Sequence, residues 1–522
     1  MIGNKNKYGN RLANYLLILF VIGTTSCTKN FDTLNTPPDK IVADNVGASL
    51  IGQAFAQCQY EGMYGHAYEW QQAQNLYADL YAQYFATTVD YFDSDQHLEI
   101  KSWSSVAWNR FYSTAAPQLY FVENLTKKNN MAIENAIVKI WSVQLYHRIT
   151  DYWGPIIYSQ FGNGKTSVSY DAQDAIYKDF IKKLDEAVAV LQQSTGNSGA
   201  FATSDLVYGG NVKKWLTFAN SLRLRLAMRM VYVEPDLAKL EAEKAVAAGV
   251  MLNNADNAAV TTTLISRNPI SEVIGWGEFR MSATMQSTLT GFNDPRLSVF
   301  FSPVSGGGYK GMRNGLPRTE RANASNLFSN LGSMYFDVVN GGTNPAIRVM
   351  SASEVYFLRA EGALRGWQMG GTADQLYNDG IKTSLKERTK VSDAEINAYI
   401  SSSNKPGAVN DKWNTPAMSD IPVAYQSAAG FEKRLEQIIT QKWIALYPDG
   451  WEAWAERRRT GYPVGFPIVE SLNPGVPVDK QMRRLTFTVG ELTNNSEAVK
   501  AALNLLGGAD VNETKLWWDK KN

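Results

Sequence analysis

Two long segments of this chain repeat apolar residues at spacings of three and four, and this period constrains the fold more than any other feature. The segments run from Tyr177 to Leu191 and from Trp215 to Met230. Such spacing places the apolar side chains along one face of an α-helix. Because a helix with one apolar face must bury that face against another element, the pattern predicts a mainly α protein built from packed helices.

Helical patterns return in the C-terminal third of the chain. Segments 354–365 and 373–385 are separated by Gly366-Trp367 and Gly370-Gly371, and small residues at Ala360, Ala363 and Gly380 would let two helices approach closely. This arrangement resembles one helix–turn–helix unit of a tetratricopeptide repeat. Further helices are expected over 431–447 and about 497–506, and a shorter one over Leu76–Thr87.

The middle of the chain, about residues 253–350, is rich in glycine and proline, with runs at 306–308 and 341–342. Proline is excluded from helix interiors, so helices here must be short. We expect loops with a few strands, one of them at Leu297–Phe301. The composition therefore predicts a loop-rich insertion in a helical scaffold.

The first 26 residues are typical of an export signal. A basic start precedes an apolar run of 12 residues, Leu12–Gly23, and small residues lead to Cys27. The run is shorter than the roughly 20 residues that span a membrane. Cys27 resembles the acylated cysteine of a bacterial lipobox, although Thr24 stands where leucine is usual. The alternative is an ordinary cleaved signal with a chance cysteine. Residues 27–45 are expected to form a lipidated tether, since Pro37-Pro38 cannot lie inside a helix.

Charge and cysteine content exclude other classes. The signal contains three of the 51 basic residues and none of the 50 acidic ones, so the rest of the chain has a net charge of −2. Nucleic-acid binding calls for a basic field, and we expect no nucleic-acid partner. Cys58 is the only cysteine after Cys27 and cannot form an internal disulfide, so we expect it to be a small buried apolar residue.

Catalytic motifs are weak. His66, His97 and His147 are scattered, with no partner cysteines for a zinc site and no triad pattern. Gly306, Gly308 and Gly311 match a nucleotide-binding spacing, but Pro317 follows where a helix would have to start. We therefore expect no enzyme activity and no cofactor. Asp93 and Asp95 lie close together and could help to hold a structural calcium ion.

Several strings, taken in order, resemble one family. They are Asn35-Thr36-Pro37-Pro38, Asp151-Tyr152-Trp153-Gly154-Pro155-Ile156, residues 220–227, Asn293-Asp294-Pro295-Arg296-Leu297, residues 353–361, Tyr377-Asn378-Asp379-Gly380-Ile381, residues 438–463, Arg483-Arg484 and Leu516-Trp517-Trp518-Asp519. The ordered set resembles the SusD/RagB outer-membrane nutrient-binding lipoproteins, and is nearest to the branch described as starch-binding.

The resemblance implies one domain over residues 46–522, with four tetratricopeptide-like helical pairs around a loop-rich ligand-binding half. It also implies a location at the cell surface on the outer membrane, and a partner, a TonB-dependent barrel transporter of the SusC type. Members of the family bind glycans, and some bind peptides. The expected function is capture of an oligosaccharide and its delivery to the transporter. A peptide-binding lipoprotein is the alternative, and a surface glycoside hydrolase is a third.

Ligand contacts are chosen by context, as aromatic residues beside polar groups in expected loops. Tryptophan, tyrosine and phenylalanine make up 12% of the chain, which leaves rings for stacking against sugars. The first cluster is Tyr91, Asp93, Asp95 and Trp103, after the helix expected at Leu76–Thr87. The second is Trp276, Phe279 and Arg280. The third is Tyr309, expected with the second cluster on the far side of a shallow groove.

Other prominent side chains are expected to be structural. Trp443, Trp451 and Trp454 follow helical spacing and should lie in the core. Arg457-Arg458-Arg459 should cap a helix end or form ion pairs there. Arg223, Arg225 and Arg359 should pair with acidic residues between helices.

We expect Cys27→Ala to release the protein from the membrane fraction. Each buried CH₂ of a lipid contributes about 0.8 kcal/mol, and several acyl chains together hold a protein firmly. Cell fractionation in a strain without the partner transporter measures the distribution of the wild type and the variant. A variant that still pellets with outer membranes contradicts the lipobox interpretation.

Overall fold

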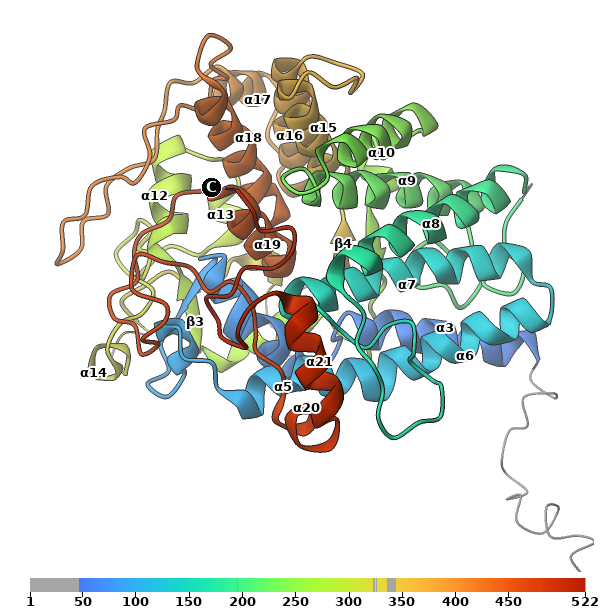
Figure 1. Cartoon of the computed structure of the whole chain (residues 1–522). Coiled ribbons are helices and arrows are strands. Elements are labelled where there is room, and N and C mark those ends of the chain that lie inside the picture. The colour runs from blue at the N-terminus through green and yellow to red at the C-terminus, as the bar shows by residue number, and fades with distance from the viewer. Residues whose placement is uncertain (1–46, 195, 323, 325, 336–343, 522) are drawn as a thin grey trace, which may run out of the picture. The chain divides into compact units, whose positions relative to one another are not determined.

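Helices dominate the computed structural model, which describes residues 47–521 apart from 195, 323, 325 and 336–343 (Figure 1). The predicted signal segment, Cys27 and tether lie outside these residues. The longer helices are α3 (Ala48–Gly62), α5 (Lys101–Arg110), α6 (Ala116–Lys128), α7 (Ala132–Trp153), α8 (Gln173–Gln192), α9 (Val212–Arg229), α10 (Pro235–Ala248), α12 (Ala283–Phe292), α15 (Ala352–Leu364), α16 (Ala373–Arg388), α17 (Asp393–Ile400), α18 (Phe431–Leu446), α19 (Gly450–Thr460) and α21 (Ser496–Leu506). The mainly α prediction is confirmed.

Consecutive helices pack as pairs: α7 with α8, α9 with α10, α15 with α16, and α18 with α19. Contacts of α8 with α9, α9 with α15 and α15 with α18 join the pairs into one array. Figure 1 shows α6 to α10 layered on one side, with α12, α13 and the loop-rich segments on the other. This arrangement agrees with the predicted tetratricopeptide-like scaffold and its loop-rich half.

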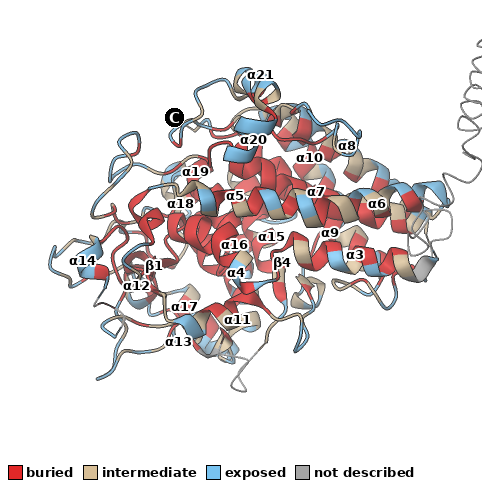
Figure 2. Ribbon diagram, turned by 90° about the horizontal axis from the view of Figure 1, so that it is seen from below, coloured by how far each residue is buried: buried red, intermediate tan, exposed pale blue. Residues whose placement is uncertain are grey.

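The apolar periods identified in the sequence are the buried faces of α8 and α9. Ile176, Tyr177, Phe180 and Leu184 of α8 are each almost fully buried. Side-chain caps define several helix starts: the Asn211 side chain accepts the Lys214 N–H at the start of α9, and Thr372 and Gln375 form a capping box at α16. Figure 2 shows buried residues along the middle of the array and exposed residues on outer helix faces and loop tips.

Gly380 explains the close packing of α15 on α16. A Cβ atom at Gly380 would lie 2.8 Å from the Phe357 ring of α15. The small residue therefore sets the distance between the paired helices, as its place in the sequence pattern predicts.

The middle of the chain is loop-rich, as predicted. It contains the short helices α11 (Pro269–Val273), α13 (Leu297–Phe300) and α14 (Arg318–Arg321), with α12 as the longest. Within the described residues, the strands form two antiparallel pairs: β1 (Phe85–Thr87) with β3 (Phe279–Met281), and β2 (Ala258–Val260) with β4 (Ile347–Met350). Strands β2, β3 and β4 belong to the middle segment. The remaining short α-helices of the described residues are α4 (Ala67–Trp70) and α20 (Val489–Asn494).

One predicted element is wrong in part and one is wrong. The helix expected over Leu76–Thr87 is helical only as far as Tyr81. It then gives way to strand β1, because Gln83 takes a positive φ of 56° and Phe85–Thr87 pair with β3. The strand expected at Leu297–Phe301 is helix α13. Its turn begins locally, since the Asp294 side chain accepts the Arg296 N–H at 2.9 Å and the Asp294 carbonyl accepts the Leu297 N–H at 3.0 Å.

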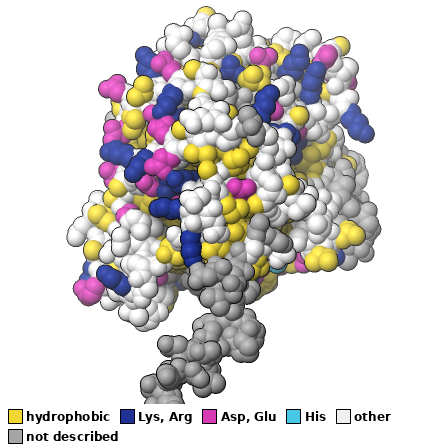
Figure 3. Space-filling model, turned by 90° about the vertical axis from the view of Figure 1, so that its right-hand side faces the viewer, with side chains coloured by type: hydrophobic (Ala, Val, Ile, Leu, Met, Phe, Trp, Pro, Cys, Tyr) yellow, Lys and Arg dark blue, Asp and Glu magenta, His cyan; other side chains and the backbone are white. Residues whose placement is uncertain are grey.

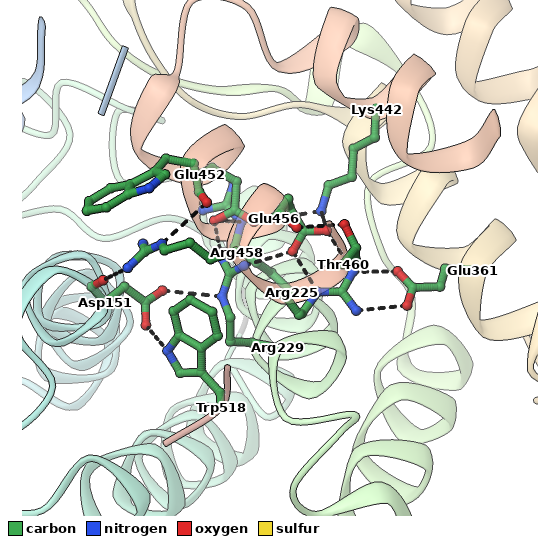
Figure 4. Close-up of polar contacts among 12 residues, drawn as sticks. Asp151, Arg225, Arg229, Glu361, Lys442, Glu452, Glu456, Arg458, Thr460 and Trp518 are labelled. Atoms are coloured by element: carbon green, nitrogen blue, oxygen red, sulfur yellow. Dashed lines mark hydrogen bonds and ion pairs between the residues drawn. The ribbon is translucent and has the colours of Figure 1, made fainter. Parts of the chain in front are cut away.

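A network of buried ion pairs joins the helical pairs (Figure 4). Arg229 of α9 contacts Glu452 and Glu456 of α19 at 2.6 and 2.7 Å. Arg459 of α19 contacts Glu361 of α15 at 2.6 Å and Glu456 at 2.7 Å. All of these side chains are at most 4% exposed.

The same network adds a second contact between α9 and α15 and reaches two further helices, α18 and α7. Arg225 of α9 pairs with Glu354 of α15 at 2.7 Å, Lys442 of α18 lies 3.2 Å from Glu456, and Arg229 lies 3.3 Å from Asp151 of α7. Burial alone would raise the pKa of Glu456, but Arg459, Lys442 and Arg229 outweigh it and hold the pKa well below its ordinary value. Each of these buried charges therefore lies beside a side chain of opposite charge.

Among the described residues, no helix is both long enough and apolar enough to cross a membrane. Cys58 is fully buried, as predicted, and burial raises the pKa of its thiol far above its ordinary value.

We expect Glu456→Gln to destabilise the protein by about 3–5 kcal/mol, because Arg229, Arg459 and Lys442 would lose a buried counter-charge. Urea unfolding midpoints measure the change. The matched control is Glu497→Gln, whose partner Lys500 is 70% exposed, and its midpoint should hardly move.

The stability difference between the wild type and Glu456→Gln should change with pH in one direction. Folding lowers the pKa of Glu456, so its contribution is present above the ordinary value of 4.5 and is lost as the pH falls below it. The gap between the wild type and Glu456→Gln should therefore narrow in acid. Equal midpoints at pH 7 contradict the assigned role of the network.

Candidate functional site

Strand pairing brings the first two predicted clusters together. The register of β1 with β3 sets Thr87 opposite Phe279. Beyond the strands, the Thr88 N–H donates to the Glu278 carbonyl at 2.9 Å, and its hydroxyl donates to the Gly277 carbonyl at 3.1 Å. The loop that carries Tyr91 is thus fastened to the turn that carries Trp276, although nearly two hundred residues separate them in the sequence.

Rings from the Tyr91 loop, from helix α5 and from strand β3 form one aromatic group around Phe92. Trp103, which was expected in a loop, lies on α5. Tyr91 and Trp103 meet Phe92 edge to face, with ring centroids 4.9 and 5.4 Å apart, and Phe279 stacks on Phe92 at 6.0 Å. Tyr91 is 56% exposed, Trp276 is 40% exposed and Trp103 is half-buried, while Phe92 and Phe279 are buried. We call Tyr91, Trp103 and Trp276 the aromatic shelf. Phe92 contacts Tyr91 and Trp103 directly, and Phe279 packs on Phe92.

Asp93 holds the shelf loop in place. Its carboxylate is buried and forms ion pairs with Arg318 and Arg321 of α14. Arg321 also donates to the carbonyls of Phe92 and Asp90. Burial would raise the pKa of Asp93, but the two guanidinium groups lower it below its ordinary value. The carboxylate is therefore ionised and fully engaged by the protein.

Asp95 also points inward. It accepts a hydrogen bond from the Asn314 amide at 2.7 Å and from the Gly315 N–H at 3.1 Å. Burial raises the pKa of Asp95 to about 6, against these hydrogen bonds. Both aspartates thus have protein partners, and their predicted role toward ligand hydroxyls stays a prediction.

Metal binding also stays a prediction. In the part of the chain that the structure describes, no three His, Cys, Asp or Glu side chains are grouped so that they could hold a metal ion.

Phe279 and Arg280 are buried in strand β3, not displayed on a loop. Phe279 packs on Phe92. Arg280 donates to the carbonyls of Gly277 and Phe279 at 2.9 and 2.7 Å, and burial lowers its pKa. Arg280 therefore shapes the turn after Trp276.

Tyr309 lines a groove together with residues from outside the first two clusters. This groove has a volume of about 490 Å³, and its lining includes Asn293, Pro295, Glu395 and Tyr399 but none of the shelf rings. The predicted single groove with Trp276 and Tyr309 on one side stays a prediction; Tyr309 shares the present groove with residues of α12 and α17.

Sequence reasoning missed three side chains that matter here. Phe92 organises the shelf, and its position beside Tyr91 was the available indication. Arg321, fully buried, anchors the loop from α14. Trp413 is 38% exposed, and Arg313 and Lys412 lie against its ring. The available indication was the pair Lys412-Trp413, a basic residue directly before an aromatic one.

The other side chains singled out in the sequence are structural. Trp443, Trp451 and Trp454 are buried, as predicted. Arg223 and Arg225 pair with Glu241 and Glu354, as predicted, whereas Arg359 donates to the carbonyls of Met369 and Gly370.

The histidines and the glycine run have the predicted structural settings. His97 and His147 are buried, and burial lowers the pKa of both, to about 4 for His97. His66 is exposed and contacts Glu61 at 3.0 Å. The glycine run 306–308 is an exposed turn.

The surface carries charges of both signs. Figure 3 views the molecule from the side of α6 to α10 and shows acidic and basic side chains interspersed, with hydrophobic side chains among them. This mixture agrees with the near-zero net charge.

The structure combines an array of packed helical pairs with exposed aromatic rings on loops that ion pairs and hydrogen bonds hold in place. This combination is typical of one class of protein, the repeat-scaffold ligand-binding proteins. The family model SusD-like, described as Susd and RagB outer membrane lipoprotein, matches residues 33–519. The chain therefore belongs to the SusD-like family of outer-membrane lipoproteins, and the predicted resemblance is confirmed.

Solved structures agree with this assignment. A chitin-binding SusD homologue from Flavobacterium johnsoniae is 36% identical with a TM-score of 0.84, over 90% of this chain and 99% of that one. A SusD homologue from Bacteroides thetaiotaomicron is 31% identical with a TM-score of 0.81, over 90% and 99% of the chains. A further structure, titled chitin-binding protein, is 28% identical with a TM-score of 0.74, over 91% and 100%. No curated protein matches this chain.

We expect Arg321→Ala to loosen the shelf loop and to destabilise the protein by about 3 kcal/mol, because Asp93 would keep a buried charge without its buried partner. Urea unfolding and hydrogen exchange of residues 89–96 measure the two effects. Arg318→Ala is the matched control: its side chain is 62% exposed and contacts the same carboxylate, so both readouts should change little. Equal effects of the two variants contradict the anchoring role of Arg321.

Proposed function

We propose that this protein binds oligosaccharides at the cell surface through the aromatic shelf. The observation that carries the proposal is the exposure of Tyr91 and Trp276, at 56% and 40%, on two loops fastened to each other, with half-buried Trp103 on helix α5. Sugar rings present apolar C–H faces that stack on aromatic rings. Rings supply large contact area with little loss of side-chain entropy, so a pre-formed shelf suits such a ligand.

Chitin oligosaccharides are the first ligand to test. Two of the structural relatives are described as chitin-binding proteins, and one of them is 36% identical over nearly its whole length. Their ligand is a property of those proteins, and we extend it to this chain as a proposal. Peptides are the alternative ligand that the sequence analysis left open. They are titrated in the same experiment and are expected not to bind.

Binding without hydrolysis is the proposed activity. A glycosidase needs two carboxyl groups about 5–10 Å apart and free to face the glycosidic bond. Asp93 and Asp95, the carboxylates on the shelf loop, are instead engaged by Arg318, Arg321, Asn314 and Gly315. Their engagement supports a binding role.

Delivery to a TonB-dependent barrel transporter completes the proposal. A lipid-anchored binder has no path of its own for moving cargo inward, so it needs a channel. Recovery of a barrel of much larger mass with this protein, from membranes solubilised in mild detergent at native expression, is the expected result. Recovery of the protein alone counts against this part of the proposal.

We expect Trp276→Ala and Trp103→Ala each to weaken chitin-oligosaccharide binding by about ten- to a hundredfold, the loss of one aromatic anchor worth on the order of 1–3 kcal/mol. Isothermal titration with the full-length lipoprotein measures the affinity, and the melting temperature should change by only a few degrees. The matched control is Tyr120→Ala, a 46% exposed ring on α6, which should bind normally.

The outcomes separate the alternatives. If both tryptophan variants unfold, these residues belong to the core. If both fold and bind like the wild type, the shelf is not the site. Tight binding of peptides and none of glycans replaces the oligosaccharide proposal with the peptide alternative, and release of shorter sugars during incubation indicates hydrolysis.

A further inference from the structure

A cavity of about 430 Å³ opens in the helical scaffold, between α6, α7, α8 and the loop that joins α7 to α8. Helix α7 packs on both α6 and α8, and Figure 1 shows the three helices in one layer. Ligand pockets commonly have volumes of about 300–1,000 Å³. None of the three shelf rings lines this cavity, so it is a separate candidate site whose occupancy does not depend on the proposed function.

Aromatic rings form part of the cavity wall. Tyr120 of α6 is 46% exposed, and half-buried Phe161 meets its ring edge to face, with centroids 6.0 Å apart. The backbone of Gly162 lies against the Tyr120 ring, because a Cβ atom there would be 2.7 Å from it. Buried Tyr146 and Tyr158 continue the wall. An exposed ring that its neighbours hold in place presents an apolar face for the C–H groups of a sugar.

The polar lining has an excess of acidic groups. Glu123, Asp171 and Asp179 supply three carboxylates, and Lys183 supplies the one ammonium group of the lining. Glu123 is half-buried, and its carboxylate has no hydrogen-bond or ion-pair partner among the described residues. One oxygen of Asp179 accepts the Tyr158 hydroxyl at 2.6 Å, and its other oxygen accepts no hydrogen bond from the described chain. Carboxylate oxygens in the cavity are therefore open to a cationic ligand.

Lys183 shows that this wall stabilises an ammonium group. Its Nζ atom lies 4.8 Å from the centroid of the Tyr158 ring and 3.8 Å from the Asp179 carboxylate. An ammonium group over the face of an aromatic ring is attracted by the electrons of that ring. One lysine balances the charge of only one carboxylate, so the lining keeps a surplus of negative charge for a second cation.

A buried hydroxyl gives independent evidence for a ligand. Ser142 of α7 lines the cavity and is only 1% exposed. Its hydroxyl forms no hydrogen bond with the described residues, yet its oxygen is not completely enclosed by them. Buried polar groups are rarely left without a partner, and a hydroxyl both donates and accepts. The Ser142 side chain therefore suits a hydroxyl group of a ligand in the cavity.

We propose that this cavity binds a single amino-sugar unit whose amine is free and positively charged. The ammonium group lies among the three carboxylates, the C–H face of the ring stacks on Tyr120, and a sugar hydroxyl bonds to Ser142. Acetylation removes the charge of an amine, so the acetylated units of chitin should bind here far more weakly. The cavity thus selects a charged amino sugar, while the aromatic shelf takes neutral oligomers.

Titration of the full-length lipoprotein in mild detergent with D-glucosamine, and with D-glucose as the neutral matched sugar, tests the proposal. Glucosamine should bind, and glucose should bind at least tenfold more weakly. Added salt should weaken glucosamine binding, because it screens the attraction between the ammonium group and the carboxylates. Equal binding of the two sugars overturns the role of the carboxylates, and the absence of glucosamine binding overturns the site.

Two variants of opposite charge should have opposite effects. Glu123→Gln removes a carboxylate without a protein partner, so it should weaken glucosamine binding about tenfold without lowering the melting temperature. Lys183→Gln removes the competing ammonium group and should strengthen binding. The matched control is Glu186→Gln: its carboxylate pairs with Lys139 at 2.6 Å and does not line the cavity, so the affinity should stay unchanged. An unchanged affinity in Glu123→Gln, or a weaker one in Lys183→Gln, overturns the proposal.

Tyr120→Ala and Trp276→Ala keep the two proposals distinguishable. Tyr120→Ala should lose glucosamine binding and keep chitin-oligosaccharide binding, and Trp276→Ala should do the reverse. Loss of glucosamine binding in Trp276→Ala shows that the amino sugar binds on the shelf, and overturns the cavity as its site. Glucosamine binding by a wild type that binds no chitin oligosaccharide supports the cavity and contradicts the proposed function alone.

Discussion

The buried ion pairs around Arg229, Glu456 and Arg459 hold this structure together. They connect α9, α15 and α19 inside the array, where each charge must find its counter-charge in a defined place. An apolar contact tolerates sliding, whereas a buried ion pair left open is strongly destabilising. The network therefore selects one relative position for helical pairs that come from distant parts of the sequence, and the loops depend on that position.

A short series of contacts connects the aromatic shelf to the helical scaffold. Helix α19 packs on the π-helical segment Gln71–Asp79. Five residues, 80–84, separate that segment from β1. β1 pairs with β3, and Arg321 holds the loop after β1 through Asp93 and the Phe92 carbonyl. Rings that are already in place lose little freedom when a ligand arrives, which favours binding by a shallow surface.

The candidate site was predictable only in part. Tyr91, Trp103 and Trp276 could be chosen because aromatic residues stood beside polar ones in segments without helical period, and the structure leaves all three at least partly exposed. Asp93 and Asp95 looked equally open, but their partners Arg321 and Asn314 lie more than two hundred residues away. Phe279 and Arg280 lie in strand β3 and not in a loop for the same reason, since pairing with a distant strand decides which way they face.

The sequence by itself determined the class of fold, because apolar period, helix caps and small residues such as Gly380 act over a few positions and leave a visible pattern. It also determined the family, through ordered strings along the whole chain. Only the tertiary structure decided that the loops after β1 and before β3 meet, and that the two aspartates turn inward. These facts depend on contacts between residues hundreds of positions apart, and a local pattern carries no record of them.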